Sequence, residues 1–400
     1  MKHTGKRKKR VFQVVILVVV LLILQKAGRL IYREYQEYVS EQQIEAVMQE
    51  VSELTEEEKE NLTEKYYYSL LSEEEKTIYE EIAAGLKEEK EEITVRSQEA
   101  TLVNQIYQMV LMDYPEFFWC DGSCETASYE GENGYSILSP TYTSVGEERV
   151  MRKQQVEAAV KECLDIIGID GSEYERIKRV YEYIIDTTEY ELEAPDNQNI
   201  YSVLVNKKSV CAGYARTTQY LLERMGIYSI YVIGTASGQE SHAWNIVQCD
   251  GAFYHVDTTW GDPVFLKQEQ REEAETISYD YLCCPDSELF VTHTLSADYT
   301  YPVCDSMDKE YYKLNGMYYE TADKERIRNA LKEAIDWQQE SVDFKFADAN
   351  VYEEGYAVIF DELLEEMAQY LGRKYELDLV NYGYMKQEET NRITIYWEYQ

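Results

Sequence analysis

The sequence contains no Cys-x-x-Cys pair, and neither His242 nor His255 has cysteine neighbours at the spacing of a zinc site. Positive charge is also scarce, because 39 basic residues face 76 acidic ones and the formal net charge is −37. Such a chain repels phosphate backbones, which argues against nucleic acid as a partner. No histidine or cysteine follows Cys304. We therefore expect no metal and no cofactor, and no covalent chemistry in the C-terminal segment.

The scarce positive charge gathers at the N-terminus, where a basic segment precedes an apolar run over 11–24 and no acidic residue occurs before Glu34. This order is typical of a secretory signal or a signal anchor. The run is shorter than the about 20 residues that span a bilayer, but Lys26 and Arg29 can snorkel and lengthen the span. No small-x-small cleavage site follows it. We predict a single-pass cell-membrane anchor over 1–33 with all later domains outside the cell. Secretion after cleavage of this segment is the alternative. A buried core helix fits less well, because the basic flank would then have no purpose.

The next segment, 34–92, is acidic and contains no proline. Thr55 and Ser72 each start a capping box, in which a hydroxyl and the carboxylate three residues later bond the free N–H groups of a helix start. We predict a helix over about 34–65 within a stalk, 34–70, that lifts the chain off the membrane. An amphipathic helix that packs back on the following domain is the alternative.

Later apolar patterns indicate further helices. They cover residues 98–118, 147–167 and a stretch that begins at Ser172. From residue 306 the pattern predicts a small α+β accessory domain, 306–400. Its expected elements are a hairpin over 311–320 around Asn315-Gly316, helices over 324–337 and 353–370, a strand over 341–346 and two final strands. A protein- or wall-binding role and a purely structural role as a buttress for the site are both open for it.

Cys211 stands at the start of a run with helical spacing that ends at Gly226, a residue suited to a helix C-terminus. The partial positive charge at a helix N-terminus favours a thiolate. The same free N–H groups can hold an oxyanion. A small residue that merely starts a helix would look alike, so the cysteine needs partners elsewhere in the chain.

Two strand-like runs flank Asp250-Gly251, a strong signal for a β-hairpin with a two-residue turn. This turn fixes the register, and the register puts His242 and Asp257 on one face as diagonal neighbours. Diagonal residues lie about 7–8 Å apart between backbones, within reach of an imidazole–carboxylate hydrogen bond. The pattern alone therefore brings a base beside an acid that can orient it.

The other histidines fit less well. His255 shares the face but lies further from the loop end, and His293 falls in an unrelated segment. A buried cysteine, a strand histidine and a capping aspartate each have common structural roles. Their conjunction in helix-then-hairpin order favours chemistry, with Cys211 as nucleophile, His242 as base and Asp257 as orienting acid.

Three blocks of this region carry a family resemblance. They are V-C-x-G-Y-A at Val210 to Ala215, H-A-W-N at His242 to Asn245, and V-D-x-T-W at Val256 to Trp260 with Gly-Asp-Pro behind it. In this order they resemble the transglutaminase-like superfamily, in particular its bacterial membrane-anchored members.

The resemblance implies a papain-like α+β core, in which the cysteine helix packs on an antiparallel sheet that bears the histidine and the aspartate. It implies the same three roles for Cys211, His242 and Asp257, with Thr259 and Trp260 supporting the acid. Ser209 departs from the pattern, since many relatives have glycine there. No oxyanion side chain carries over, so the backbone N–H of the cysteine is the expected donor.

These observations together predict a catalytic domain over 71–305 that acts outside the cell on amide bonds of protein or peptidoglycan peptides, through a thioacyl intermediate. Water would make the enzyme a peptidase or amidase, and an amine would make it a transglutaminase. A surface binding protein that keeps the fold without turnover is the alternative. A third possibility is a structural surface protein stapled by disulfides, in which Cys211 itself would be bonded. Because an outside location permits disulfides, Cys120 with Cys124, and Cys304 with Cys283 or Cys284, are candidate pairs.

Overall fold

The computed structural model describes residues 25–27, 29–30, 32, 44–131, 133–238, 240–262 and 277–399. No helix among them is long and apolar enough to cross a bilayer. The predicted anchor run, 11–24, lies outside the described residues, so the anchor stays a prediction. By their contacts the described residues form two compact units, one up to Val110 with Gly122–Thr141 and one of Leu111–Asp121 with everything from Tyr142. The predicted catalytic domain thus contributes to both units.

The first unit combines short helices with a three-stranded sheet of order β1-β3-β2. Its helical elements are α2 (Glu56–Asn61), η1 (Leu62–Glu64), α3 (Tyr66–Ser69), α4 (Glu73–Lys87) and most of α5 (Ala100–Asp113). Its strands are β1 (Ile93–Val95), most of β2 (Cys120–Tyr129) and β3 (Tyr135–Tyr142). Helix α4 lies against β1, where a Cβ on Gly85 would come within 2.6 Å of Ile93.

The capping boxes predicted at Thr55 and Ser72 are confirmed. The continuous helix over 34–65 is wrong in its described part, because the chain leaves the helix near Glu50 and a new short helix starts after Thr55. Leu62 and Tyr67 are completely buried. This segment therefore packs within the unit, as the alternative expectation had it.

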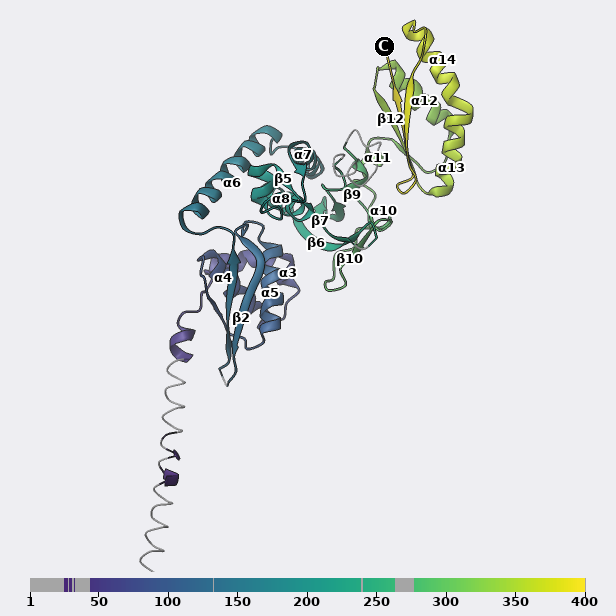
Figure 1. The fold of residues 1–400 in the computed structure, drawn as a ribbon. Helices are drawn as coiled ribbons and strands as arrows, with labels where there is room; N and C mark the ends of the chain where they lie inside the picture. The colour runs from purple at the N-terminus through teal and green to yellow at the C-terminus, as the bar shows by residue number, and fades with distance from the viewer. Residues whose placement is uncertain are drawn as a thin grey trace, which may run out of the picture. The chain divides into compact units, whose positions relative to one another are not determined.

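The second unit is built around a five-stranded antiparallel sheet of order β10-β6-β7-β8-β9 (Figure 1). The strands are β6 (Ser229–Ala236), β7 (Glu240–Cys249), β8 (Ala252–Val256), β9 (Leu282–Cys284) and β10 (His293–Leu295). The helical elements around it include α6 (Gly146–Ile167), α7 (Glu173–Thr187), η2 (Ser202–Asn206), α8 (Cys211–Arg224), η3 (Tyr279–Tyr281) and α10 (Asp286–Leu289), and β4 (Glu189–Tyr190) pairs with β5 (Lys208–Ser209). Helix α8 packs on β6 and β7. The predicted α+β core, with the cysteine helix on an antiparallel sheet, is confirmed.

The predicted hairpin register is also confirmed. Cys249 pairs with Ala252 across the turn. Asp250 and Gly251 have φ angles of 49° and 86°, the two positive values that a type I′ turn requires. Asp-Gly tolerates these angles at low cost, which explains why the dipeptide predicts the turn.

Within the second unit, residues 310–399 form a C-terminal subdomain. Its strands pair in the order β11-β12-β14-β13, with β11 parallel to β12. Its elements are α11 (Tyr311–Leu314), β11 (Tyr318–Tyr319), α12 (Lys324–Asp336), β12 (Ser341–Phe346), α13 (Ala349–Ala357), η4 (Val358–Leu363), α14 (Leu364–Tyr375), β13 (Tyr382–Gln387) and β14 (Arg392–Trp397). The long helices pack on one face of the sheet over an apolar core (Figure 1).

One predicted element of the subdomain is wrong. The hairpin over 311–320 is instead the short helix α11, which Glu310 caps by accepting hydrogen bonds from the backbone at Tyr312 and Lys313. Asn315 ends the helix, and Gly316 follows with a φ of 74°. An Asn-Gly pair suits a helix C-terminus as well as a hairpin turn, so it did not decide between them.

None of the eight cysteines, all of which lie in the described part of the chain, forms a disulfide. Cys120 and Cys124 lie on one strand, β2, where a separation of four residues corresponds to about 13 Å. A disulfide needs Cα atoms closer than about 7 Å, so this candidate pair is wrong. Neither Cys283 nor Cys284 is bonded to Cys304.

Candidate active site

Cys211 is the first residue of α8, and Val210 before it is extended. The loop that precedes the helix lies in close contact with the first turn of the helix. A Cβ on Gly213 would lie 1.9 Å from the Ser209 hydroxyl and 3.1 Å from the Asn197 carbonyl. Ser209 donates a 2.7 Å hydrogen bond to that carbonyl. The glycine of the V-C-x-G-Y-A block is thus required for this close approach, and Ser209 fills the space above it.

His242 and Asp257 meet as the hairpin register predicted. The His242 Nε2 atom lies 2.6 Å from Asp257 Oδ2, at the open end of the hairpin. The other carboxylate oxygen accepts hydrogen bonds from the backbone N–H groups of Thr259 and Trp260, at 2.9 and 3.0 Å. The support expected from these two residues comes from their backbones.

A second histidine reaches the same carboxylate. His293 Nε2 lies 3.1 Å from Asp257 Oδ2, and its Nδ1 lies 2.7 Å from the Thr292 hydroxyl. The prediction that His293 belongs to an unrelated segment is therefore wrong. Strand β10 pairs with β6 and so carries His293 beside the hairpin. No local pattern in the sequence indicates this pairing, because β10 is short and distant along the chain. The scarcity of histidine is the one available signal.

The charges of this cluster shift its pKa values. Burial opposes the imidazolium form of His242, but the attraction and hydrogen bond of Asp257, together with Cys211, outweigh it and raise the pKa to about 10. Burial likewise opposes the charged form of Asp257, but His242 and the hydrogen bonds from both histidines hold the pKa of that carboxyl well below its usual range. The arrangement favours an imidazolium next to Cys211.

Trp244 lies among all three histidines of the described chain. Its ring stacks on His242 at 5.8 Å and meets His293 edge to face at 5.3 Å. Its indole N–H donates a 3.1 Å hydrogen bond to Nδ1 of His255. The tryptophan of the H-A-W-N block thus fixes the ring planes on both sides of the acid.

His255 has a structural environment. Its Nδ1 accepts from Trp244, so the hydrogen-bond network assigns the proton to Nε2, which lies 2.8 Å from Asp286 Oδ1. The ring is fully buried, and burial lowers its pKa. Both ring nitrogens of His255 are therefore satisfied, by Trp244 and by Asp286.

Some of these side chains also have metal-ligand chemistry. Three groups of the described residues bring possible ligand atoms within 4.8 Å of one another: His242 with Asp257 and His293, His255 with Asp286 and Cys304, and Glu173 with Cys249 and Asp250. In the first two groups the histidine nitrogens are already bonded to the aspartate. The geometry is that of hydrogen-bonded pairs.

Hydrogen bonds join the sequence blocks to one another. The Asn245 amide donates to the Ala215 carbonyl at 3.0 Å, which ties the H-A-W-N block to α8. The Tyr214 hydroxyl donates to Asp262 at 2.8 Å, which ties α8 to the segment after the acid. The blocks are therefore the parts of one site and hold its geometry.

A cavity of about 580 Å³ opens beside Cys211 and His242. Strands β6, β7 and β10 and the loop before α8 form its wall. The lining residues are Gln198, Val210, Cys211, Ala212, Tyr231, Ile233, Gly234, Thr235, Ser241, His242, Ala243, Thr294, Leu295 and Ser296. No Asp, Glu, Lys or Arg is among these lining residues, although the chain is strongly acidic.

Comparison with known proteins covers the same region. The profile of the transglutaminase-like superfamily matches residues 163–258, which include Cys211, His242 and Asp257. Kyphoscoliosis peptidase of Mus musculus is 27% identical over 113 residues, which are 24% of this chain and 17% of that protein. The Homo sapiens protein of that name is 23% identical over 145 residues, or 32% and 21% of the two chains. The match thus spans less than a quarter of either relative.

Solved structures with similar parts include a TGase, with 15% identity, a TM-score of 0.25 and coverage of 34% of this chain and 44% of that one. A putative cysteine protease from Cytophaga hutchinsonii has 14% identity, a TM-score of 0.24 and coverage of 36% and 64%. The profile match and the two curated relatives agree with the three sequence blocks. Residues 163–258 are a domain of the transglutaminase-like superfamily.

Proposed function

We propose that the protein is a cysteine enzyme that cleaves or transfers acyl groups of amide bonds. The observation that supports it most is that Cys211 and His242 line one cavity while the buried Asp257 holds the His242 ring. The raised pKa of His242 provides a proton donor near the thiol. A fold of this superfamily is compatible with both peptidases and acyltransferases.

In the first half-reaction the Cys211 thiolate attacks the amide carbonyl and forms a C–S bond. The oxyanion lies near the first backbone N–H groups of α8, which have no carbonyl partner within the helix. As the intermediate collapses, the C–N bond breaks and the His242 imidazolium gives its proton to the leaving amine. Asp257 keeps the ring oriented throughout.

In the second half-reaction His242 takes a proton from water or from an amine, which attacks the thioester and releases Cys211. The name of the curated relatives, a peptidase, favours water. The superfamily name favours an amine. The residues of the site serve both outcomes, and the cavity, whose lining contains no Asp, Glu, Lys or Arg, favours an acyl segment without charged side chains.

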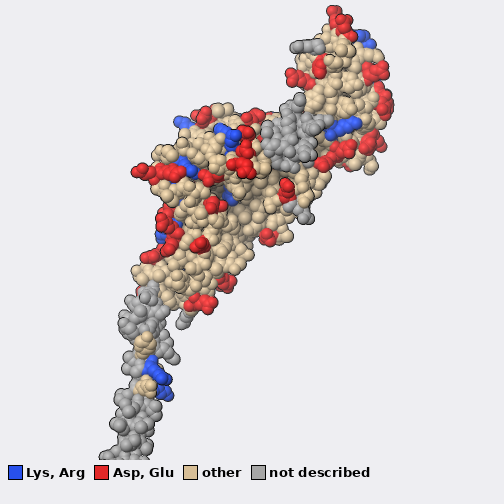
Figure 2. Space-filling model, viewed as in Figure 1, with Lys and Arg blue, Asp and Glu red and all other residues tan. Residues whose placement is uncertain are grey.

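We place this reaction outside the cell, on protein or peptidoglycan peptides, with the N-terminal segment in the membrane. Acidic side chains are spread over the viewed face of the molecule (Figure 2). Contact with an anionic membrane must then come from the basic and apolar N-terminus. The same acidity argues against nucleic acid.

The test is to incubate the purified protein with protein and peptidoglycan substrates, with and without a fluorescent primary amine. Amine incorporation that disappears in Cys211→Ala selects the transferase, and new peptide termini select the hydrolase. Cys124→Ala, which alters a half-buried thiol in the other unit, is the matched control and should keep full activity. Equal behaviour of Cys211→Ala and the native protein would leave a binding role as the better account.

A further inference from the structure

Two cations of the C-terminal subdomain are buried on the face of its sheet that turns away from the helices. Lys345 on β12 pairs with Arg392 on β14, so the two side chains are direct neighbours. Their exposed side-chain fractions are only 3% and 6%. Two like charges at this depth require an anion, because burial of an unpaired ion costs several kcal/mol.

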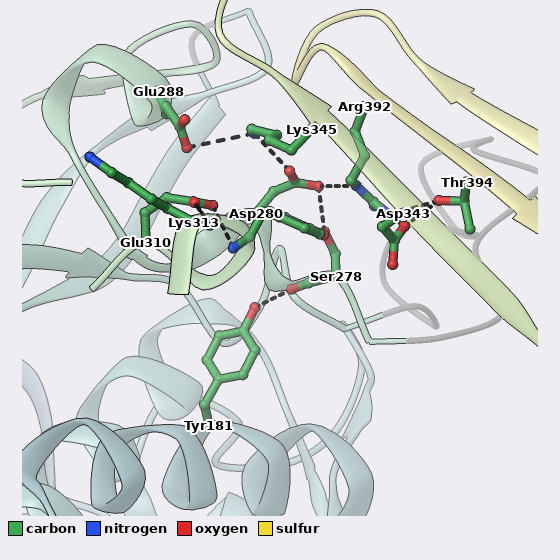
Figure 3. A network of polar contacts seen from close by, with 11 residues as sticks. Tyr181, Ser278, Asp280, Glu288, Glu310, Lys313, Asp343, Lys345, Arg392 and Thr394 are labelled. Atoms are coloured by element: carbon green, nitrogen blue, oxygen red, sulfur yellow. Dashed lines mark hydrogen bonds and ion pairs between the residues drawn. The ribbon is translucent and has the colours of Figure 1, made fainter. Parts of the chain in front are cut away.

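The anion is Asp280, which belongs to η3 and lies outside the subdomain. Its Oδ1 lies 2.9 Å from Lys345 Nζ, and its Oδ2 lies 3.0 Å from Arg392 Nε (Figure 3). The Ser278 hydroxyl donates to Oδ2 at 3.1 Å. Burial opposes the ionised carboxyl, but the two cations outweigh it and lower the pKa of Asp280. The carboxylate is thus held on both oxygens by one subdomain.

Secondary contacts balance the remaining charges. Glu288 lies 3.6 Å from Lys345 Nζ, and Arg392 also donates to Asp343 and Thr394 at 2.9 and 3.0 Å (Figure 3). Asp280 is nevertheless the group that contacts both cations. Together with Glu288 on α10, it attaches the subdomain to the core by charge.

The residues next to Asp280 hold the segment that carries Asp257. The backbone N–H of Asp257 donates to the Tyr281 carbonyl at 2.9 Å. The backbone N–H of Ser278 donates to the Gly261 carbonyl at 3.0 Å. The Tyr181 hydroxyl on α7 donates to the Ser278 carbonyl at 2.5 Å (Figure 3). Asp280 thus lies between the two attachments of residues 257–261.

We propose that the C-terminal subdomain positions the orienting acid of the site: Lys345 and Arg392 clamp Asp280, and Asp280 fixes the Tyr281 carbonyl that holds the Asp257 backbone. The inference rests on the proposed function, because it assigns these three groups to positioning within that site. They touch no reacting atom. The subdomain is then a part of the catalytic apparatus, with a role other than substrate capture.

The test uses Lys345→Met in the full-length protein, with the rate of Cys211 carboxymethylation by iodoacetate as a function of pH. An imidazolium attracts this anionic reagent, so the rate falls where His242 loses its proton, near pH 10 in the native protein. A misplaced Asp257 weakens the support of the imidazolium. We expect the alkaline limb to move down by about one pH unit or more, a tenfold change in the acid constant.

Two variants act as controls. Lys345→Arg keeps a cation near Asp280 and should restore most of the native profile. Lys386→Met removes a lysine of the same subdomain that lies over the Tyr356 ring at 4.0 Å, and it should leave the limb unchanged. The double variant Lys345→Met with Asp280→Asn removes one charge of each sign and leaves Arg392 paired with Asp343. It takes the place of the single variant if Lys345→Met alone unfolds the chain.

The outcomes separate the two hypotheses. A native alkaline limb in folded Lys345→Met and in the pair would overturn the positioning role while the proposed function stands. A native protein whose Cys211 reacts no faster than in His242→Ala would overturn the proposed function itself. A lowered limb in Lys345→Met and in the pair with Asp280→Asn, with a limb close to native in Lys345→Arg and Lys386→Met, supports the clamp.

Discussion

Asp257 is the most constrained side chain of the site. Each of its oxygens receives two donors, the backbone N–H groups of Thr259 and Trp260 on one and the rings of His242 and His293 on the other. A carboxylate with this number of donors stays ionised even when it is completely buried. Its charge in turn is the main attraction that keeps His242 protonated.

Removal of that charge gives a pH-dependent prediction. In Asp257→Asn burial of His242 is no longer opposed by a carboxylate, so its pKa should fall from about 10 to below the ordinary value of about 6.5. In the native protein the pKa of His242 is higher in the folded than in the unfolded state. This difference stabilises the fold at pH values below the unfolded pKa, and the stabilisation is lost as the pH rises toward 10. Urea midpoints of the native protein should therefore fall between about pH 6.5 and 10.

Asp257→Asn should lack most of this decline, and its reaction with iodoacetate should be slower by about 10²-fold or more at neutral pH. The rate and the urea midpoint are measured on the same samples. An unchanged alkaline limb in the asparagine variant would contradict the assignment of Asp257 as the partner of His242.

His293 supplies a second residue-scale prediction. His293→Ala removes one of the donors to Asp257 Oδ2 inside a closed site, which should cost about 1–3 kcal/mol of unfolding free energy. His293→Gln keeps an N–H donor and should recover part of the loss. Urea denaturation at pH 7 measures both, and equal stability of the native protein and His293→Ala would show that this hydrogen bond contributes nothing.

At the scale of single residues, the sequence predicts the His242–Asp257 pair because the turn of the hairpin determines its geometry. The Asp250-Gly251 angles fix the register, and the register places His242 beside Asp257. His293 was missed because its place depends on the pairing of a three-residue edge strand with β6, which no local pattern specifies. Buried polar contacts of this kind are set by tertiary structure.

Gly234 shows how strands β6 and β10 constrain the site together. A Cβ at this position would lie 2.1 Å from the Thr294 carbonyl and 2.7 Å from the Trp244 ring. The glycine therefore lets β10 pair closely and lets Trp244 lie against His242. Its role is close approach, since no positive φ is recorded for it.

Gly234→Ala should displace β10 or Trp244, with a cost of about 1–3 kcal/mol in stability and a loss of Cys211 reactivity of about tenfold, as expected when a site is misplaced slightly. Gly383→Ala is the matched control, because a Cβ there meets the Tyr396 side chain only at 3.7 Å, an ordinary contact. Thermal melts and iodoacetate rates check both variants. Native reactivity in Gly234→Ala would mean that the tryptophan stack is not needed.

At the scale of helices and strands, the sequence predicted an element correctly where a local motif has one structural meaning. Ser172 and Ser72 start helices because their capping boxes satisfy N–H groups that have no partner within the helix. Asn315-Gly316 failed as a hairpin signal because the same dipeptide also ends helices. Its meaning depends on Glu310, whose carboxylate caps the short helix before it.

At the scale of the whole molecule, no pattern in the sequence predicts how the C-terminal subdomain attaches to the core. Lys345 and Arg392 alternate with apolar neighbours in their strands, a pattern typical of a solvated face. The structure instead buries both against Asp280. Charge pairing between segments so distant along the chain has no periodicity that a single sequence can reveal.

The N-terminal segment gives the last prediction, at the scale of the whole chain. The apolar run over 11–24 and its basic flanks favour insertion into a bilayer, whereas the strong net negative charge repels anionic lipid. The full-length protein should therefore float with anionic vesicles in a density gradient, and the 34–400 fragment should stay at the bottom. Ile16→Lys with Val20→Lys places charges in the run, each costing about 2.5–3.5 kcal/mol at a bilayer centre, and should release the full-length protein. Flotation of the 34–400 fragment would show that another surface binds the membrane, and sedimentation of the full-length protein would exclude the anchor.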